Sequence, residues 1–299
     1  MPSLLDMTDV PMTNILEQCD FKSVLKLRKV CHGLREFIDN ANLKTDLNRV
    51  HVTLNSISDC QTHLTSNFSK TQDRKILTAD DLNTILNIQN SKLSELQVTC
   101  GSPEILRSFE ETLKSKPRPL QTERLEMKVL SGAEILMILP YLDSKPLKDI
   151  TILPADIEKD IEDLDGIERI LELDQFKNAV GLSIERFFVN ADLKKLFHFK
   201  RIAVKFRGIP LEDLVALKEA FITTTHMKYF SLQGPNIDEI ELEKAFGAPF
   251  YDDYTDTRAW FFKVRGSKEH VLKVEFVVDI LVFWRINVKE IPKNAVFSD

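Results

Sequence analysis

The sequence is poor in glycine and has none of the glycine-rich loops that hold phosphates. Nine glycines are scattered over 299 residues, and neither G-x-x-x-x-G-K nor G-x-G-x-x-G occurs. Such loops let backbone N–H groups approach a phosphate closely. Nucleotide binding through either motif is therefore excluded.

Cysteine and histidine are also scarce and widely spaced. There is no C-x-x-C pair, and none of the six histidines stands in an H-E-x-x-H motif. These patterns give neither a disulfide framework nor a zinc site, so no metal or cofactor is expected. We expect the cysteines to be reduced thiols that are buried as small apolar side chains, at Cys19, Cys31, Cys60 and Cys100.

No apolar run approaches the roughly 20 residues that a membrane-spanning helix needs. The longest candidate, residues 271–286, is interrupted by charged side chains. A net charge of -6 and a pI near 5.7 give no basic field that would favour nucleic acid or an anionic membrane as a partner. Because no cationic segment followed by an apolar run begins the chain, we expect a cytoplasmic or nuclear protein.

No catalytic constellation is predicted. Residues 181–185, GLSIE, lack the second glycine of a nucleophile elbow and lie on an expected strand. The carboxylate pairs at 80–81 and 252–253 fall in turns or at helix starts, where capping accounts for them. A hydrolase or transferase built on an α/β sheet stays open as an alternative, and it would need a deep pocket ringed by titratable groups.

The chain does have three short amphipathic helical patterns within residues 7–40. Apolar residues recur there every three to four positions, which gives each helix an apolar stripe. Asp20 or Ser23 can cap the second helix. The segment is too short to bury a core of its own, so it suits a small domain attached to a larger one. The alternative is that it forms only the first helical layer of that larger domain.

The order of residues in this segment resembles an F-box. Met7, Thr8 and Asp9 stand at its Leu-Pro-acid start, and Cys19-Asp20 at its Leu-Asp pair. Relative to that pattern, a proline, a leucine and a tryptophan are replaced by Thr8, Cys19 and Leu34. The other motif positions follow in order as Ile15, Leu16, Val24, Leu27, Val30, Cys31 and Ile38.

From residue 47 the pattern changes to strands that alternate with helices. Residues 47–54 alternate with period two, and a second strand is expected near residues 63–68. Capped helical patterns begin at Ser102-Pro103, at Ser131 with Glu134 as a capping box, at Pro210 and at Pro235. Short strands of one form recur between them, with central anchors at Leu96, Leu125, Ile150, Leu182, Ile202 and Phe230.

These anchors are separated by 29, 25, 32, 20 and 28 residues, which are leucine-rich-repeat distances with irregular spacing. The sequence therefore predicts an α/β protein in which an N-terminal three-helix domain precedes a leucine-rich-repeat-like solenoid with a curved parallel sheet. A doubly wound α/β domain is the alternative. The polar position kept between the apolar ones of each strand disfavours it, because parallel strands covered on both faces read as continuous apolar runs.

Two further segments have their own patterns. Residues 155–174 contain nine acids and two bases, and we expect an amphipathic helical layer with an acidic face, which could also dock a basic partner. Residues 259–286 alternate on both sides of Arg265-Gly266, which predicts a β-hairpin followed by one more strand. Such a piece would cap the open end of a solenoid.

With its F-box, its strand–helix repeats and this aromatic hairpin, the chain resembles the large nematode-type F-box family that carries an FTH domain. The resemblance implies an F-box at residues 1–42 and an FTH or degenerate repeat domain at residues 43–299. It also implies a substrate-recognition subunit of a Skp-cullin-F-box ubiquitin ligase, with no bond chemistry of its own. The partners would be the Skp adaptor, through it a cullin, and an unknown protein target.

Two sets of site residues follow from this resemblance. The implied contacts with the Skp adaptor are Met7, Thr8, Ile15, Leu16, Val24, Leu27, Val30 and Leu34. The expected target-binding set consists of polar strand positions between the apolar anchors, at Gln97, Glu126, Lys128, Thr151, Ser183, Lys205, Ser231 and Gln233. The alternative is a non-catalytic repeat protein that binds a protein partner without assembling a ligase.

Overall fold

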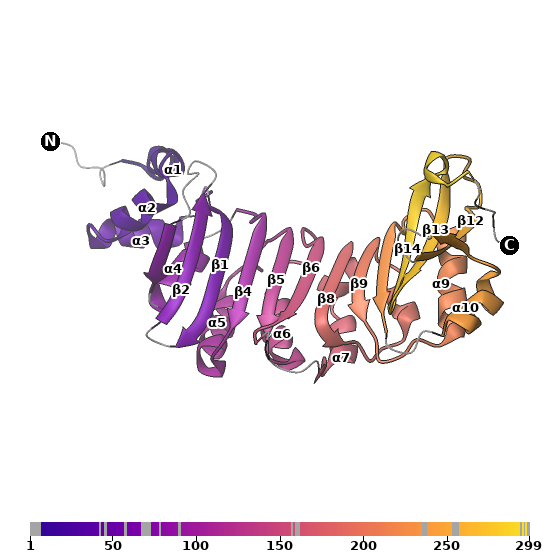
Figure 1. The fold of residues 1–299 in the computed structure, drawn as a ribbon. Coiled ribbons are helices and arrows are strands. Elements are labelled where there is room, and N and C mark those ends of the chain that lie inside the picture. Colours follow the sequence, from indigo (N-terminus) through magenta and orange to yellow (C-terminus); the bar gives the residue numbers. More distant parts are fainter. Residues whose placement is uncertain are drawn as a thin grey trace. The chain divides into compact units, whose positions relative to one another are not determined.

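A computed structural model of the chain (Figure 1) describes residues 7–41, 43–44, 47–56, 59–66, 73–77, 79–88, 91–156, 158, 162–234, 238–252, 257–293, 295 and 297. The chain divides into two compact units, Met1–Asp149 and Ile150–Asp299, which we call unit 1 and unit 2. Both are mixed α/β, as the sequence predicts.

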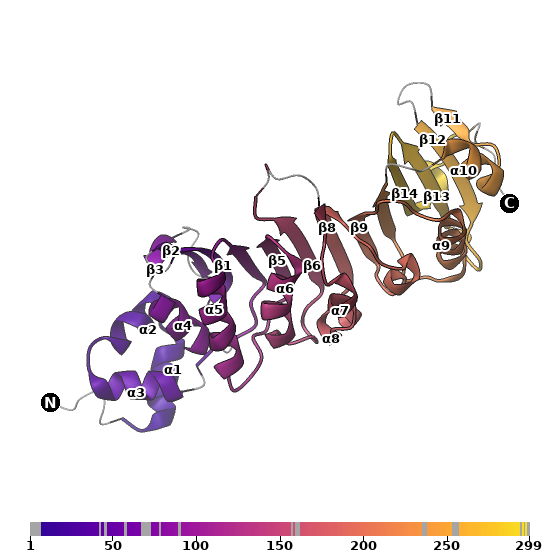
Figure 2. The same cartoon turned by 90° about the horizontal axis from the view of Figure 1, so that it is seen from below.

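Unit 1 begins with helices α1 (Asp9–Glu17), α2 (Phe21–Arg28) and α3 (His32–Asn40). A sheet follows, with strands β1 (Leu47–Ser56), β2 (Asp59–Ser66), β3 (Asp73–Leu77), β4 (Glu95–Cys100) and β5 (Arg124–Val129) in the order β5-β4-β1-β2-β3. Strands β1, β4 and β5 are parallel, whereas β2 and β3 pair antiparallel. Helices α4 (Ala79–Ile88), α5 (Pro103–Ser115) and α6 (Gly132–Ile138) lie along one side of these strands (Figure 2), and a 3-10 turn, η2 (Leu139–Tyr141), follows α6.

Side chains of the parallel strands alternate between the two sides of the sheet. In β4, Leu96, Val98 and Cys100 are buried, while Gln97 and Thr99 are half-buried on the opposite side. This alternation is the consequence of the period-two strand geometry. It leaves one side of the sheet packed and the other side open.

Unit 2 continues the strand–helix pattern. Its sheet has the order β6-β8-β9-β10-β14-β13-β12-β11, with β7 beside β8. The first strands are β6 (Asp149–Pro154), which begins at the unit boundary, β7 (Glu162–Asp163), β8 (Gly181–Phe188), β9 (Arg201–Lys205) and β10 (Tyr229–Gln233). Strands β7 to β10 pair in parallel. The helical elements are α7 (Ile167–Leu171), α8 (Asp174–Asn178), η3 (Leu193–Leu196), α9 (Leu211–Thr223) and α10 (Glu239–Phe246).

The C-terminal strands are antiparallel. They are β11 (Phe250–Asp252), β12 (Thr257–Lys263), β13 (His270–Val277) and β14 (Ile280–Asn287), followed by η4 (Val288–Glu290). Strands β12 and β13 form the predicted hairpin, and β14 pairs on one side with β13 and on the other with β10. Aromatic contacts join the sheet to helices α9 and α10. Phe221 of α9 packs against Phe230 of β10 and Phe283 of β14. Phe246 of α10 packs against Trp260, Phe262 and Phe283.

Both sides of β12 are covered. Trp260 and Phe262 pack against Phe246, and the Trp260 indole N–H donates to the carbonyl of Gly247 at 2.7 Å. On the other side, Ala259 and Phe261 form a cluster with Val271 and Ile286, against which Phe250, Trp284, Ile291 and Ala295 pack. The simple alternation that the sequence predicts for this strand is therefore incomplete, because the chain after β14 supplies a second cover.

The structure has a strand at each of the six predicted anchors, but it corrects the predicted caps. Neither Ser102 nor Ser131 makes a side-chain cap hydrogen bond. The carboxylate of Glu134 instead accepts from the backbone N–H of Leu130 at 2.7 Å, one residue before the predicted box. The predicted start of a helix at Pro235 lies outside the described residues, and α10 is capped by Asp238, which accepts from Ile240.

Two segments differ from their predicted form. The second strand spans residues 59–66 rather than 63–68, of which 67 and 68 lie outside the described residues, and β3 was not predicted. Among the described residues of the acidic stretch, 162–163 form β7 and 167–171 are helical before Asp174 starts α8. Residues 157 and 159–161 of this stretch are not described. The helical prediction for the whole stretch is therefore wrong.

Candidate functional site

The first candidate site is the N-terminal helical layer of unit 1. Asp20 caps α2, because its carboxylate accepts from the N–H of Ser23 at 2.7 Å, as expected for a residue at this position. The guanidinium of Arg28 in α2 holds both carboxylate oxygens of Asp39 in α3, at 2.6 and 2.9 Å. Two-point pairing of this kind fixes orientation as well as distance, so α2 and α3 are held in one geometry.

Five apolar residues of this layer lie in one buried cluster. Leu16, Val24 and Leu34 are at most 5% exposed and cluster with Met12 and Ile38. The cluster is completed by Leu43, which follows α3, and by Ile88 at the end of α4. The helical layer therefore also packs onto the rest of unit 1. Leu16, Val24 and Leu34, three of the predicted adaptor contacts, are therefore buried in the interior of the layer.

The other predicted adaptor contacts reach the surface. Val30, between α2 and α3, is 68% exposed, and Met7, Thr8 and Ile15 are exposed, while Leu27 is half-buried. Val10 in the first turn of α1 is 70% exposed and was not assigned to the adaptor surface, because it is not one of the motif positions. Its place in the apolar stripe was the only signal for it.

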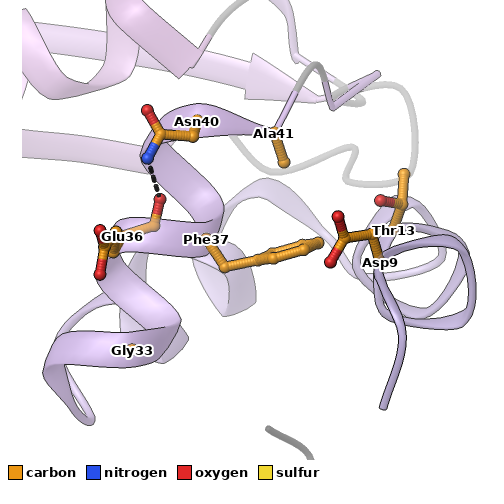
Figure 3. A pocket seen from close by; sticks show the side chains of 7 residues that line it. All are labelled: Asp9, Thr13, Gly33, Glu36, Phe37, Asn40 and Ala41. Atoms are coloured by element: carbon orange, nitrogen blue, oxygen red, sulfur yellow. Dashed lines mark hydrogen bonds between the residues drawn. The ribbon is translucent and has the colours of Figure 1, made fainter.

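A groove lies between α1 and α3. It has a volume of about 440 Å³ and is lined by Asp9, Thr13, Gly33, Glu36, Phe37, Asn40 and Ala41. Figure 3 shows Phe37 of α3 pointing across the groove toward Asp9 and Thr13 of α1, with Glu36 at its far side. The amide of Asn40 donates to the carbonyl of Glu36 at 2.9 Å. This groove combines a half-buried aromatic floor with two carboxylates, and sequence reasoning missed it.

The second candidate site is the open side of each sheet, where the predicted target-binding residues lie. In unit 1, Gln97 and Glu126 are in register on β4 and β5, and the Gln97 amide donates to the Glu126 carboxylate at 2.5 Å. Thr99 and Lys128 form the next row. Arg49 and Arg124 flank Glu95 at 3.7 and 3.5 Å. The open side of unit 1 is therefore polar and largely satisfied by its own charges.

The other five predicted positions lie in unit 2. Ser183, Ser231 and Lys205 are half-buried on β8, β10 and β9, and Gln233 is in register with Lys205. Thr151 lies on β6 and is also half-buried. Six apolar residues on this side of the sheet were not predicted as part of the site: Ala203, Tyr229, Val277, Ile280, Val282 and Trp284. The continuous apolar run at residues 280–284 was the sequence signal for Ile280, Val282 and Trp284.

Burial, with Glu134 nearby, raises the pKa of the Cys100 thiol, which therefore stays protonated and is a poor nucleophile at neutral pH. Cys19 and Cys31 are free and half-buried, whereas Cys60 lies outside the described side chains. Ring nitrogens of His198 and His226 lie 2.8–3.2 Å from backbone carbonyl oxygens.

Neither a metal-binding cluster nor a membrane-spanning helix occurs among the described residues. No group of three or more histidine, cysteine, aspartate or glutamate side chains there is placed to hold a metal ion. Within the same residues, no helix combines the length and the apolar character needed to cross a bilayer.

Comparisons with known protein families cover both parts of the chain. Residues 4–46 match the F-box domain and so include α1, α2 and α3. Residues 103–250 match the FTH domain, from the start of α5 to the first residue of β11. The C-terminal hairpin lies beyond this range. Comparisons with curated proteins and with solved structures gave no match. The chain is an F-box protein with a C-terminal FTH domain.

Proposed function

We propose that this F-box protein is the substrate-recognition subunit of a Skp-cullin-F-box ubiquitin ligase. Residues 1–42 would bind the Skp adaptor and residues 43–299 would bind a protein target. The observation that carries the proposal is the F-box match over a helical layer with a packed core, whose Val10 and Val30 side chains are about two-thirds exposed. Exposed apolar residues of this kind suit a protein interface.

The mechanism would be one of proximity rather than of bond chemistry. A target held on residues 43–299 would be kept near the ubiquitin-carrying enzyme that the cullin recruits. Its effective concentration there would rise by orders of magnitude over free solution. F-box and FTH domains are typically non-catalytic adaptor domains, which agrees with this role. Such a ligase would work in the cytoplasm or the nucleus.

We further propose that residues 43–299 form a degenerate leucine-rich-repeat-like solenoid with the 259–286 segment as its cap. In support, parallel strands β4 and β5 in unit 1 and β8, β9 and β10 in unit 2 alternate with helical segments. In unit 2, β14 pairs with β10, the last strand of the parallel series. A terminal piece with this position would shield the core of the last repeat.

Co-purification of the full chain with the Skp adaptor tests the ligase proposal. Ile15→Asp and Val30→Asp place a charge at exposed positions of the F-box and should abolish binding, while the chain stays folded. Deletion of residues 1–40 should also abolish it. The matched control is Ile240→Asp, because Ile240 is an exposed isoleucine on a helix of unit 2 and its substitution should leave binding intact.

Substitutions of Leu16 or Val24 are unsuitable for this test. Both side chains are buried in the F-box core, so a charge there would unfold the domain instead of probing its surface. If the unmodified chain does not retain the adaptor, the ligase role is refuted, and a non-catalytic protein-binding repeat protein remains. If Ile15→Asp and Val30→Asp both bind normally, the adaptor meets another surface of the F-box.

A further inference from the structure

Among the residues that the structure describes, no helix covers one side of strands β9, β10, β14 and β13 (Figure 1), and we call this side the open strand face. Phe230 and Leu232 of β10 are fully buried toward the helices, where Phe230 meets Phe221 of α9 edge-on at 5.2 Å. Tyr229, Ser231 and Gln233 point to the other side of the same strand and are half-buried. The open strand face is therefore the side opposite α9.

The strand registers place an apolar group on the open strand face beside the turn between β13 and β14. One row across the sheet runs through Ala203, Ser231, Val282 and Glu275, and the next runs through Lys205, Gln233, Ile280 and Val277. Val282, Ile280 and Val277 are thus neighbouring aliphatic positions, and Ala203 lies in the same row as Val282 with Ser231 between them. On the open side of unit 1, the corresponding rows on β1, β4 and β5 are polar throughout. The apolar character is particular to unit 2.

The turn that joins β13 to β14 ends this group with a strained valine. Val278 has φ 58° and is 86% exposed. A β-branched residue is an outlier in the left-handed region, and such strain persists only where the surroundings enforce it. They do so here, because the Asp279 carbonyl accepts from Gly234 and the Asp279 carboxylate accepts from the Gln233 amide, both at 3.0 Å. The turn is pinned to the end of β10 with its apolar side chain in solvent.

The charges around this group sum to zero, with Lys205 and Lys273 opposite in sign to Glu275 and Asp279. Lys273 and Glu275 pair with each other at 3.0 Å, and the Asp279 carboxylate is engaged by Gln233. Lys205, in the same row as Ile280, has no ion-pair partner among the residues that the structure describes, and its ammonium lies 5.1 Å from the ring centre of Phe188. An acidic group on a docked segment would complement Lys205.

We infer that Val277, Val278, Ile280 and Val282 bind an apolar segment of the target protein that also carries a carboxylate paired with Lys205. This inference rests on the proposed function and names the part of the recognition domain that would read the target. Among the polar positions predicted from the sequence, it retains Lys205, Ser231 and Gln233, and it adds the aliphatic residues between them.

The test uses the full chain and a phage-displayed library of random 12-residue peptides. Peptides selected on the wild-type chain should be enriched in apolar and acidic residues. The selected peptides are then synthesised and their affinities measured for Val278→Asn, for Lys205→Glu and for the control Val288→Asn, whose valine is exposed outside the open strand face. Val278→Asn should weaken binding by about tenfold, as expected for loss of a buried valine side chain. Lys205→Glu should also weaken binding, and Val288→Asn should not.

A second readout separates binding from folding. Asparagine adopts positive φ readily, so Val278→Asn should raise the thermal midpoint by about 2–4 °C while it weakens binding. If Val278 had no role in binding, Val278→Asn would raise the thermal midpoint and leave the affinity for the peptides unchanged. The inference is overturned if no peptide is enriched, if the enriched peptides lack acids, or if they bind both variants as they bind wild type.

Two further measurements identify other outcomes. If the wild-type chain sediments as a dimer and Val278→Asn as a monomer, a second copy of the chain covers the face and the inference is wrong. Adaptor co-purification should be unchanged in both open-face variants. The two proposals can fail separately. If deletion of residues 1–40 abolishes adaptor binding but no peptide is selected, the ligase role is supported and this inference alone is refuted.

Discussion

Arg285 of β14 closes the C-terminal end of α9, and its removal should weaken unit 2 measurably. One terminal nitrogen of its guanidinium, Nη2, donates to the carbonyls of Phe221 and Thr224 at 2.6 and 2.5 Å. Carbonyls in the last turn of a helix have no partner within the helix. Burial lowers the pKa of Arg285, so the structure bears a desolvation cost to keep this cation in place.

The size of the effect follows from these contacts. A hydrogen bond to a charged group contributes about 1.5–3 kcal/mol, and two of them, reduced by the desolvation cost, leave about 2–3 kcal/mol. For a unit of the size of Ile150–Asp299 this corresponds to a fall of about 5–10 °C in the thermal midpoint. We therefore expect Arg285→Met, which keeps much of the apolar stem, to show this loss by circular dichroism.

Arg285→Lys is the control for charge, because it keeps the cation but loses the planar fork. It should lie between wild type and Arg285→Met. Amide hydrogen exchange should also be faster in the last turn of α9 in Arg285→Met. A midpoint within about 1 °C of wild type would falsify the view that this arginine stabilises the end of α9.

Two more predictions concern unit 1. Leu16→Ala should lower the free energy of unfolding in urea by about 2–5 kcal/mol, because Leu16 is fully buried. Ile15→Ala should change it by no more than about 0.5 kcal/mol, because Ile15 is exposed. Equal effects of the two substitutions would contradict the assignment of the core. Burial lowers the pKa of Lys116 from 10.5 to about 8 in the folded protein, so between pH 8 and 10.5 the unfolded chain binds more protons. The stability of wild type relative to Lys116→Met should therefore rise with pH across that window, and a constant difference in urea midpoint would refute it.

The positions of the strands could be predicted from the sequence because each one repeats a short, period-two apolar pattern. Leu96, Leu125 and Phe230 are all at most 1% exposed, as anchors of a packed face should be. The F-box helices were also recognisable, since Leu16 and Val24 are motif positions, but the sequence placed these two side chains at the adaptor contact and the structure buries them. Local capping was predicted less accurately than the strands. Ser131 and Glu134 have the spacing of a capping box, but the Glu134 carboxylate accepts from the N–H of Leu130 instead of that of Ser131.

What the sequence could not separate is which apolar residues are buried. Leu16 and Ile15 are neighbours in one helix, yet one fills the core and the other lies at the surface. Likewise, the run at residues 280–284 predicts a strand but does not say that Ile280 and Val282 lie on a side without helices. Both distinctions depend on how helices pack on the layer beneath them, which is a tertiary property.

The antiparallel strands of unit 2 also determine what its last sheet edge offers to other chains. An open edge presents unpaired N–H and C=O groups and can template aggregation. Here β14 occupies the edge of β10, and the terminal strand β11 spans only residues 250–252. Farther along β12, Phe261 is bridged by Phe297. This edge therefore leaves little unpaired backbone on which another polypeptide could extend the sheet. The unit 2 sheet is thus protected at this end from edge-to-edge aggregation.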